Sequence, residues 1–261
     1  MSLVEYKKKD HLVTITMNRP DKLNALDAGM LTGLRESWIR YRDDDDAWLA
    51  IFTGTGRAFS AGADKSWFVK GLQGEDFLGP FVNTISKDPY WNEELDKPTI
   101  VAVNGYALGG GFELALKADL RVAAESARFQ ISEVQLGGVL ILWDNLPYAI
   151  AAELVSGNML TAQRAYEVGM VNRVFPDNKL MDGAMEMAEE LLSRAPLALY
   201  HSLKILREMK RAAMPVPRNL IRSSLISDYT TLLGKELIRT EDWKEANVAL
   251  LEKKKPVFKK K

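Results

Sequence analysis

The chain has 261 residues, of which 47% are hydrophobic, and its 35 Lys and Arg residues are balanced by 35 Asp and Glu. This length is enough for one large α/β core with a smaller appended unit. The zero net charge provides no field that would favour nucleic acid or a membrane surface. The absence of Cys excludes disulfides, thiolate metal sites and a Cys nucleophile. No apolar run approaches the ~20 residues of a membrane span, and the first residues lack the apolar core of a signal peptide. We therefore expect a cytoplasmic protein with neither nucleic acid nor membrane as partner.

The first half of the chain predicts alternating strands and helices. Val13, Ile15 and Met17 alternate with Thr residues, which is the pattern of a strand. Asp27 is the predicted N-cap of a helix. Four side chains fall on one face of that helix: Met30, Leu34, Trp38 and Tyr41. Two short apolar runs, 48–53 and 99–103, predict buried parallel strands.

Two stretches in this half are irregular. The acidic run 43–46 predicts a solvated loop, and a metal site is the alternative. Residues 66–97 lack clean periodicity and predict an insertion of short helix and loop. The insertion is rich in aromatic residues: Trp67, Phe68, Phe77, Phe81, Tyr90 and Trp91.

Two glycine-rich turns, 58–64 and 104–113, each follow a predicted strand. Glycine allows a positive φ and close approach of the backbone to a ligand. A helix that begins at such a turn leaves its first N–H groups unpaired, at the positive end of its dipole. Two such turns side by side can direct two N–H donors at one oxygen, which is what an oxyanion hole requires. Two carboxylates follow, Glu113 and Glu133.

At these residues the chain resembles the crotonase superfamily, the enoyl-CoA hydratase/isomerase family. The resemblance runs in order from about residue 4 to 195. Its segments are Asn18–Leu26, Thr53–Asp64, Lys97–Glu113, Asp119–Ala123, Phe129–Glu133 and Thr161–Val171.

The resemblance implies an α/β fold of the ClpP/crotonase type. A spiral of ββα repeats over residues 1–195 would carry the active site, and a helical region over 196–261 would form the interface of a homotrimer or a dimer of trimers. Apolar helical side chains in this second region need a covering surface. They are Leu199, Leu203, Leu206, Leu220, Ile221, Leu225 and Tyr229.

The resemblance also implies roles for individual residues. The backbone N–H groups of Ala63 and Gly110 would form the oxyanion hole for a thioester oxygen. Glu113 would hold and activate water, and Glu133 would deliver or accept the Cα proton. Further contacts with the acyl-CoA substrate would come from Arg57, Ala61, Asp64, Trp67 and Gly109. No cofactor or metal is expected, since coenzyme A is part of the substrate.

Because both glutamates are present, we expect an enoyl-CoA hydratase, a lyase that adds water to a 2-enoyl-CoA or removes it from a 3-hydroxyacyl-CoA. An acyl-CoA isomerase, hydrolase or carbon–carbon lyase is the alternative, and a non-catalytic or RNA-associated member of the superfamily also remains open. The glycine spacing fits neither GxGxxG nor GxxxxGK[ST], which disfavours a nucleotide-binding module. His11 and His201 have no supporting motif for a serine hydrolase, and we expect both to be structural or exposed.

The chain departs from the family pattern directly after Glu133, where the segment is several residues short. Asp144 in this segment is a candidate additional acid. Residues 66–97 and 137–148 are expected to set acyl specificity, with the aromatic residues forming either a local core or an apolar wall for the acyl group. Their aromatic content predicts a bulky or cyclic acyl group over a C4 chain. The basic tail 253–261 is expected to be solvated, and a place near the CoA phosphates is the alternative.

Overall fold

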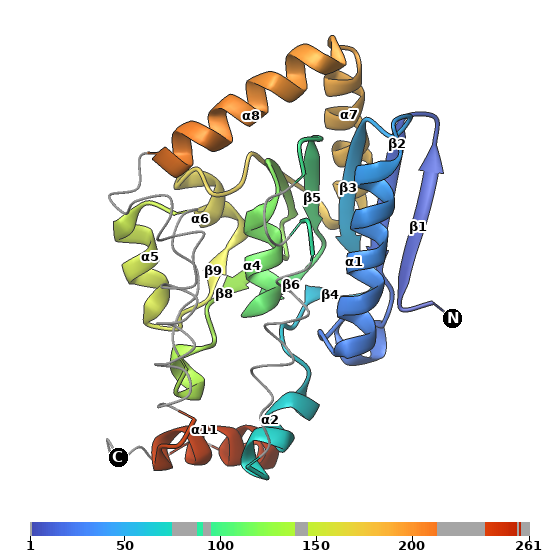
Figure 1. The fold of residues 1–261 in the computed structure, drawn as a ribbon. Helices are drawn as coiled ribbons and strands as arrows, with labels where there is room; N and C mark the ends of the chain where they lie inside the picture. Colours follow the sequence, from blue (N-terminus) through green and yellow to red (C-terminus); the bar gives the residue numbers. More distant parts are fainter. Residues whose placement is uncertain are drawn as a thin grey trace.

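The computed structural model describes residues 2–74, 88–90, 95–138, 146–212, 238–254 and 256. A six-stranded sheet lies at its centre (Figure 1). In spatial order its strands are β1 (Val4–Lys9), β2 (Leu12–Met17), β3 (Leu49–Gly54), β5 (Thr99–Val103), β7 (Leu120–Ala124) and β10 (Arg173–Phe175). β1 is antiparallel to β2, and the other neighbours pair in parallel. The strand predicted from Val13, Ile15 and Met17 and the strands predicted at 48–53 and 99–103 are confirmed to within a residue.

A second, four-stranded sheet consists of short strands. In order these are β4 (Ala58–Ser60), β6 (Tyr106–Leu108), β8 (Arg128–Gln130) and β9 (Leu160–Thr161). Successive strands alternate between the sheets, since β3, β5 and β7 belong to the large one and β4, β6 and β8 to the small one. Helices follow the pairs: α2 (Lys65–Leu72), α4 (Gly110–Lys117) and α5 (Tyr148–Val155). This is the predicted spiral of ββα repeats.

Helices cover both faces of the large sheet. α1 (Ala28–Asp43) begins at Asp27, whose carboxylate accepts a 2.8 Å hydrogen bond from the N–H of Met30. The predicted apolar face of α1 is buried against β1 and β2. On the opposite face, α7 (Leu180–Leu192) packs against alternate side chains of the strands, such as Ile100 and Ala102. Shorter helical segments are α6 (Ala162–Glu167) and the 3-10 turns η1 (Pro20–Lys22), η2 (Val134–Leu136) and η3 (Asp177–Lys179).

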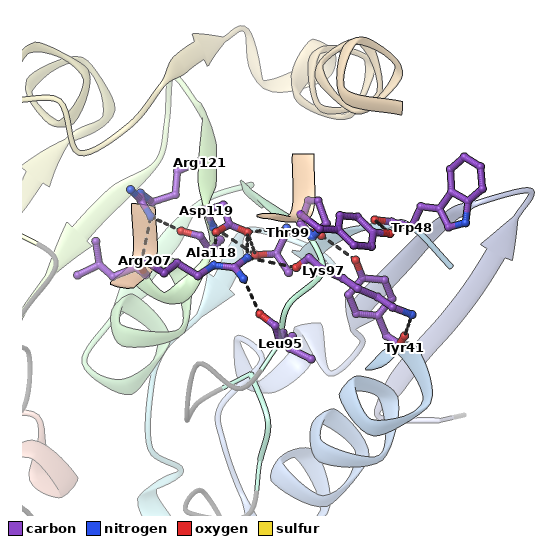
Figure 2. Close-up of polar contacts among 12 residues, drawn as sticks. Tyr41, Trp48, Leu95, Lys97, Thr99, Ala118, Asp119, Arg121 and Arg207 are labelled. Carbon is purple, nitrogen blue, oxygen red and sulfur yellow. Dashed lines mark hydrogen bonds and ion pairs between the residues drawn. The ribbon is translucent and has the colours of Figure 1, made fainter. Parts of the chain in front are cut away.

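Hydrogen bonds and an ion pair connect the helix α8 (Pro196–Ala212) to the core (Figure 2). The Arg207 guanidinium binds both carboxylate oxygens of Asp119, at 2.8 and 2.7 Å, and donates to the carbonyl oxygens of Leu95 and Lys97. Asp119 accepts a further hydrogen bond from the N–H of Thr99. The first helix after residue 195 is therefore joined to the start of β5 and to the end of α4.

The last helix, α11 (Glu241–Glu252), packs against α2 and η2 at one end of the molecule (Figure 1). Trp243 is buried in this contact, and its backbone passes so close to Gly137 that a Cβ atom there would lie 3.1 Å from the Trp243 Cα. Four of the apolar side chains expected in the C-terminal helices, Leu220, Ile221, Leu225 and Tyr229, lie outside the described residues.

The predicted insertion at 66–97 is described only in part. Trp67 on α2 and Tyr90 belong to the main core rather than to a local cluster. The Trp67 indole N–H donates to the Leu26 carbonyl oxygen at 2.8 Å, and the Tyr90 ring stacks on Trp38 with centroids 4.2 Å apart. Phe68 is partly buried against the same core. Three of the other aromatics, Phe77, Phe81 and Trp91, lie outside the described residues.

The acidic run is partly helical, because α1 continues through Asp43. Lys8 pairs with Asp44 and Asp46 at 2.8 and 2.9 Å. In the described parts of the chain, His, Cys, Asp and Glu do not gather in threes with a geometry suited to a metal ion. None of the described helices has the length and apolarity that a membrane crossing requires.

Candidate active site

The pairing of β4 with β6 places the two glycine-rich turns side by side. Gly62, with φ of +80°, packs so tightly on the second turn that a Cβ atom would lie 2.6 Å from the Leu108 carbonyl oxygen and 3.2 Å from the Gly110 nitrogen. This conformation and this space suit glycine alone. The turns that the sequence places nearly fifty residues apart therefore form one surface.

Ala63 and Gly110 each present a backbone N–H at this surface. The Gly62 carbonyl accepts from the N–H of Leu26, and the N–H of Asp64 donates to the Leu26 carbonyl, so these neighbours of Ala63 fix its peptide groups. Gly110 is the first residue of α4, where N–H groups have no partner within the helix. Within the described ranges neither N–H has an acceptor.

Gly109, the residue before Gly110, lies against Glu133. Its φ is +50°, and a Cβ atom would lie 2.8 Å from both the Glu133 Oε1 and the Ser132 Oγ. The Gly109 N–H donates to the Gln130 carbonyl at 2.9 Å, which joins the second glycine turn to the end of β8. Because β6 pairs with β8 in this register, Glu133, which follows β8, lies next to the start of α4, which follows β6.

Glu113 lies in the first turn of α4 and is buried, with 6% of its surface exposed. Burial, reinforced by the negative charge of Glu133, raises the pKa of Glu113 to about 8, against an opposing effect of Lys117. Burial also raises the pKa of Glu133, while hydrogen bonds from the Glu133 and Ser132 backbone N–H groups act in the opposite direction.

Two carboxyl groups in such a site do not ionise independently. The first ionisation makes the second less favourable, so the pair retains a proton to a higher pH than a solvated carboxyl would. One protonated and one ionised carboxyl are the acid and base that a reversible proton transfer requires at neutral pH.

The other predicted substrate contacts occupy different surroundings. Asp64 caps α2 by accepting from the Ser66 N–H at 2.9 Å and pairs with Arg19, also at 2.9 Å. The Trp67 indole N–H donates to the carbonyl of Leu26, which forms a β-bridge with Ala63. The Asp64 and Trp67 side chains therefore stabilise the turn that contains Ala63. Ala61 is partly buried and donates its N–H to the Leu23 carbonyl. Arg57 is exposed in the turn between β3 and β4, and Asp144 lies outside the described residues.

Two polar residues beside these turns were not among the sequence-based candidates. Asn24 is completely buried, and its side-chain amide donates to the carbonyls of Thr55 and Ala58 at 2.9 Å. Arg19 bridges Asp27 and Asp64. The segment 18–26 belongs to the family resemblance, but both Asn24 partners and one Arg19 partner, Asp64, lie over thirty residues away in the sequence. Ser132 is a further omission.

Of the two histidines, His11 stacks on Trp48 with ring centroids 3.5 Å apart, and its Nδ1 lies 3.1 Å from Asp46. His201 is exposed on α8. Both are structural or exposed, as predicted.

Comparison with known proteins agrees with this fold. Residues 7–261 match the model of the enoyl-CoA hydratase/isomerase family. The carnitinyl-CoA dehydratase of Salmonella paratyphi B is 40% identical over 260 residues, with 95% of each chain covered. A carnitinyl-CoA hydratase structure from Mycobacterium avium has a TM-score of 0.83 and 32% identity over both full chains. A methylmalonyl-CoA decarboxylase structure has a TM-score of 0.82 and 27% identity over 99% of both chains.

The alternating two-sheet spiral and its adjacent glycine turns define a crotonase-type acyl-CoA enzyme. The chain belongs to the enoyl-CoA hydratase/isomerase family, and it is an enzyme of the hydratase-like lyase type.

Proposed function

We propose that this enzyme interconverts a 3-hydroxyacyl-CoA and the corresponding 2-enoyl-CoA by removing or adding water, with carnitinyl-CoA as its first candidate substrate. One observation carries the proposal. Two carboxyl groups that influence each other's ionisation, Glu113 and Glu133, lie beside two backbone N–H groups that have no acceptor among the described residues.

In this proposal the N–H groups of Ala63 and Gly110 bind the thioester oxygen. Removal of a Cα proton from the acyl chain places negative charge on that oxygen, and two fixed donors stabilise the charge where it develops. The dipole of α4 acts in the same direction, because its positive end lies at Gly110. In a well-studied hydrolase, the loss of one such donor lowers the rate by about 10²–10³-fold.

The two glutamates divide the proton transfers. In dehydration, the ionised Glu133 accepts the Cα proton and the electron pair of that bond enters the enolate. The enolate then expels the 3-hydroxyl group, which leaves as water after taking the proton held by Glu113. Hydration is the reverse: Glu113 accepts a proton from water as the oxygen joins Cβ, and Glu133 returns a proton to Cα. The raised pKa of Glu113 supports the protonated form that dehydration requires.

The acyl group is proposed from similarity. Two relatives carry carnitinyl-CoA in their names, and one of them is 40% identical over 95% of each chain. Carnitine is a 3-hydroxy acid with a quaternary ammonium group, and aromatic side chains bind such groups through cation–π interactions. Coenzyme A would enter with the substrate, with no separate cofactor, and the exposed Arg57 is the proposed phosphate contact.

The experiment is a substrate series followed by mass spectrometry and ultraviolet absorbance, with carnitinyl-CoA, crotonyl-CoA and cyclic or longer enoyl-CoA thioesters. Glu113→Gln and Glu133→Gln should each lower kcat by orders of magnitude, whereas Glu125→Gln, at an exposed position, should not. Water addition or removal at wild-type rates in either site variant would refute the assignment. Turnover of crotonyl-CoA in preference to every larger acyl group would overturn the expectation of a bulky substrate.

A carbon–carbon lyase remains the second candidate because of the structural similarity to methylmalonyl-CoA decarboxylase. Decarboxylation needs an oxyanion hole but no acid–base pair to handle water. The presence of both glutamates favours the hydratase, and methylmalonyl-CoA in the same substrate series separates the two activities.

A further inference from the structure

Ser132 lies in the site but has no part in the chemistry described so far. Its Oγ and the Glu133 Oε1 each lie 2.8 Å from the point that a Cβ atom of Gly109 would occupy, so the two oxygens flank the same backbone position. The next residue is Gly110, the proposed oxyanion donor. Ser132 is partly buried, and its hydroxyl makes no hydrogen bond within the described parts of the chain.

Buried serines elsewhere in the core are satisfied. The Ser60 hydroxyl donates to the Asn24 carbonyl at 2.8 Å, and the Ser37 hydroxyl donates to the Gly33 carbonyl at 2.7 Å. The Ser132 Oγ is not among the side-chain atoms of the described residues that are buried without a partner, so it keeps contact with the surface of the site. The Ser132 hydroxyl therefore differs from these two serines in being available to a ligand at the reaction centre.

We propose that the Ser132 hydroxyl binds the oxygen atom that adds to, or leaves from, the acyl chain. The inference rests on the proposed function and deepens it. In hydration the water donates one hydrogen to the ionised Glu113, and one of its lone pairs forms the bond to Cβ. The proton of Glu133 is directed at Cα, so the second lone pair of the water lacks a donor. A serine hydroxyl supplies one O–H donor. Ser132 keeps its proton throughout, since Glu113 and Glu133 carry out the proton transfers.

A nucleophilic role for Ser132 is disfavoured by the surroundings of the histidines. A serine nucleophile of the serine–histidine type requires a histidine beside the hydroxyl. His11 is engaged with Asp46 and Trp48, and His201 is exposed on α8. The hydrogen-bonding role needs no such base.

The test compares two reactions of the same site in the Ser132→Ala variant. Hydration of the preferred 2-enoyl-CoA needs the water oxygen. Exchange of the Cα hydrogens of the matching saturated acyl-CoA in D₂O needs only Glu133 and the oxyanion hole. Loss of one neutral hydrogen bond of about 0.5–1.5 kcal/mol corresponds to a decrease of roughly 2- to 13-fold. Hydration should fall by this factor, and Cα exchange should remain at the wild-type rate.

Ser132→Thr, which restores a hydroxyl, should recover part of the hydration rate, and Ser156→Ala, at an exposed serine, is the matched control. An equal decrease in both reactions would overturn the proposal and assign Ser132 to the enolate step. Unchanged hydration in Ser132→Ala would also overturn it, while leaving the hydratase assignment intact. A wild-type protein that exchanges Cα hydrogens but hydrates no thioester would refute the proposed function itself, and this role of Ser132 with it.

Discussion

The Glu113 carboxyl and the Glu133 carboxyl are electrostatically coupled, since the charge on Glu133 adds to the effect of burial in raising the pKa of Glu113 to about 8. The relationship is a consequence of topology. Glu113 comes from the first turn of α4, and Glu133 follows β8, whose pairing with β6 brings it to the start of that helix.

This coupling predicts how stability depends on pH. The pKa of Glu113 is raised on folding from 4.5 to about 8, so the folded state binds more protons between these values. The free energy of unfolding should therefore decrease as pH rises through this window, by at most about 1.4 kcal/mol per pH unit from this group. Urea unfolding at pH 5.5 and 8 measures the slope, and Glu113→Gln should reduce it. An identical slope in that variant would contradict the assigned pKa.

Removing the partner charge should lower the pKa of Glu113. In Glu133→Asn, Glu113 loses the neighbouring negative charge, so its pKa should fall while remaining raised by burial. Carbon-13 NMR of the Glu113 carboxyl, followed against pH in the two proteins, measures this difference. An unchanged pKa would mean that the two groups titrate independently.

Gly109→Ala should inactivate the enzyme. A Cβ atom would press on Glu133 Oε1 and Ser132 Oγ, and a displacement of about 1 Å in a reacting group lowers rates by about 10²-fold. Gly169→Ala is the control for a side chain added at positive φ, because Gly169 has a φ of +73° and open space around the added Cβ atom. Both variants should lose stability, Gly109→Ala the more because its ψ of −126° lies outside the left-handed helical region, and only Gly109→Ala should lose kcat. Comparable activity in the two would show that contact at Gly109 is unimportant.

Arg207→Met should destabilise the fold strongly. It leaves the Asp119 carboxylate, with a side chain 8% exposed, without its bidentate partner, and the cost of breaking such a pair is about 3 kcal/mol. Lys204→Met on the same helix removes an exposed ion pair with Asp96 and should change stability by less than about 1 kcal/mol. Thermal unfolding compares them. Equal effects would show that the Arg207 contacts do not hold α8 in place.

If the protein forms the expected trimer, a neighbouring subunit should bury the exposed apolar side chains on the outer face of α8. Leu197, Ile205 and Leu206 on this helix are 69%, 59% and 58% exposed, and apolar surface of this kind is commonly buried in closed oligomers. Light scattering should give the mass of three or six chains, and Leu206→Glu should reduce it. A wild-type monomer across a wide concentration range would exclude the assembly.

The sequence was most informative where structure is local. Asp27 as a helix cap, the buried face of α1 and the strands at 13–17, 48–53 and 99–103 follow from periodicity and capping within a few residues. The family resemblance supplied the spiral and the grouping of Ala63, Gly110, Glu113 and Glu133. Periodicity alone contains no information on the alternation of strands between two sheets.

What sequence could not provide depends on distant partners. Arg207 and Asp119 are 88 residues apart, and neither is distinguishable from a surface charge until the fold joins them. Tyr90 resembled part of a local cluster, yet it stacks on Trp38 in the main core. Ser132 has no signal of its own, because its position matters only through the glycine turn that it faces.

The contact of α11 with α2 and η2 has a consequence for the order of events during synthesis. α2 begins directly after the turn of Ala63, and η2 begins directly after Glu133. Both of these segments flank the site, and both pack against α11, which lies more than a hundred residues later in the chain. While the ribosome is still translating residues 241–252, α2 and η2 lack their contacts with α11. The nascent chain can form its sheets early, but the segments beside Ala63 and Glu133 gain these contacts only when α11 emerges and docks.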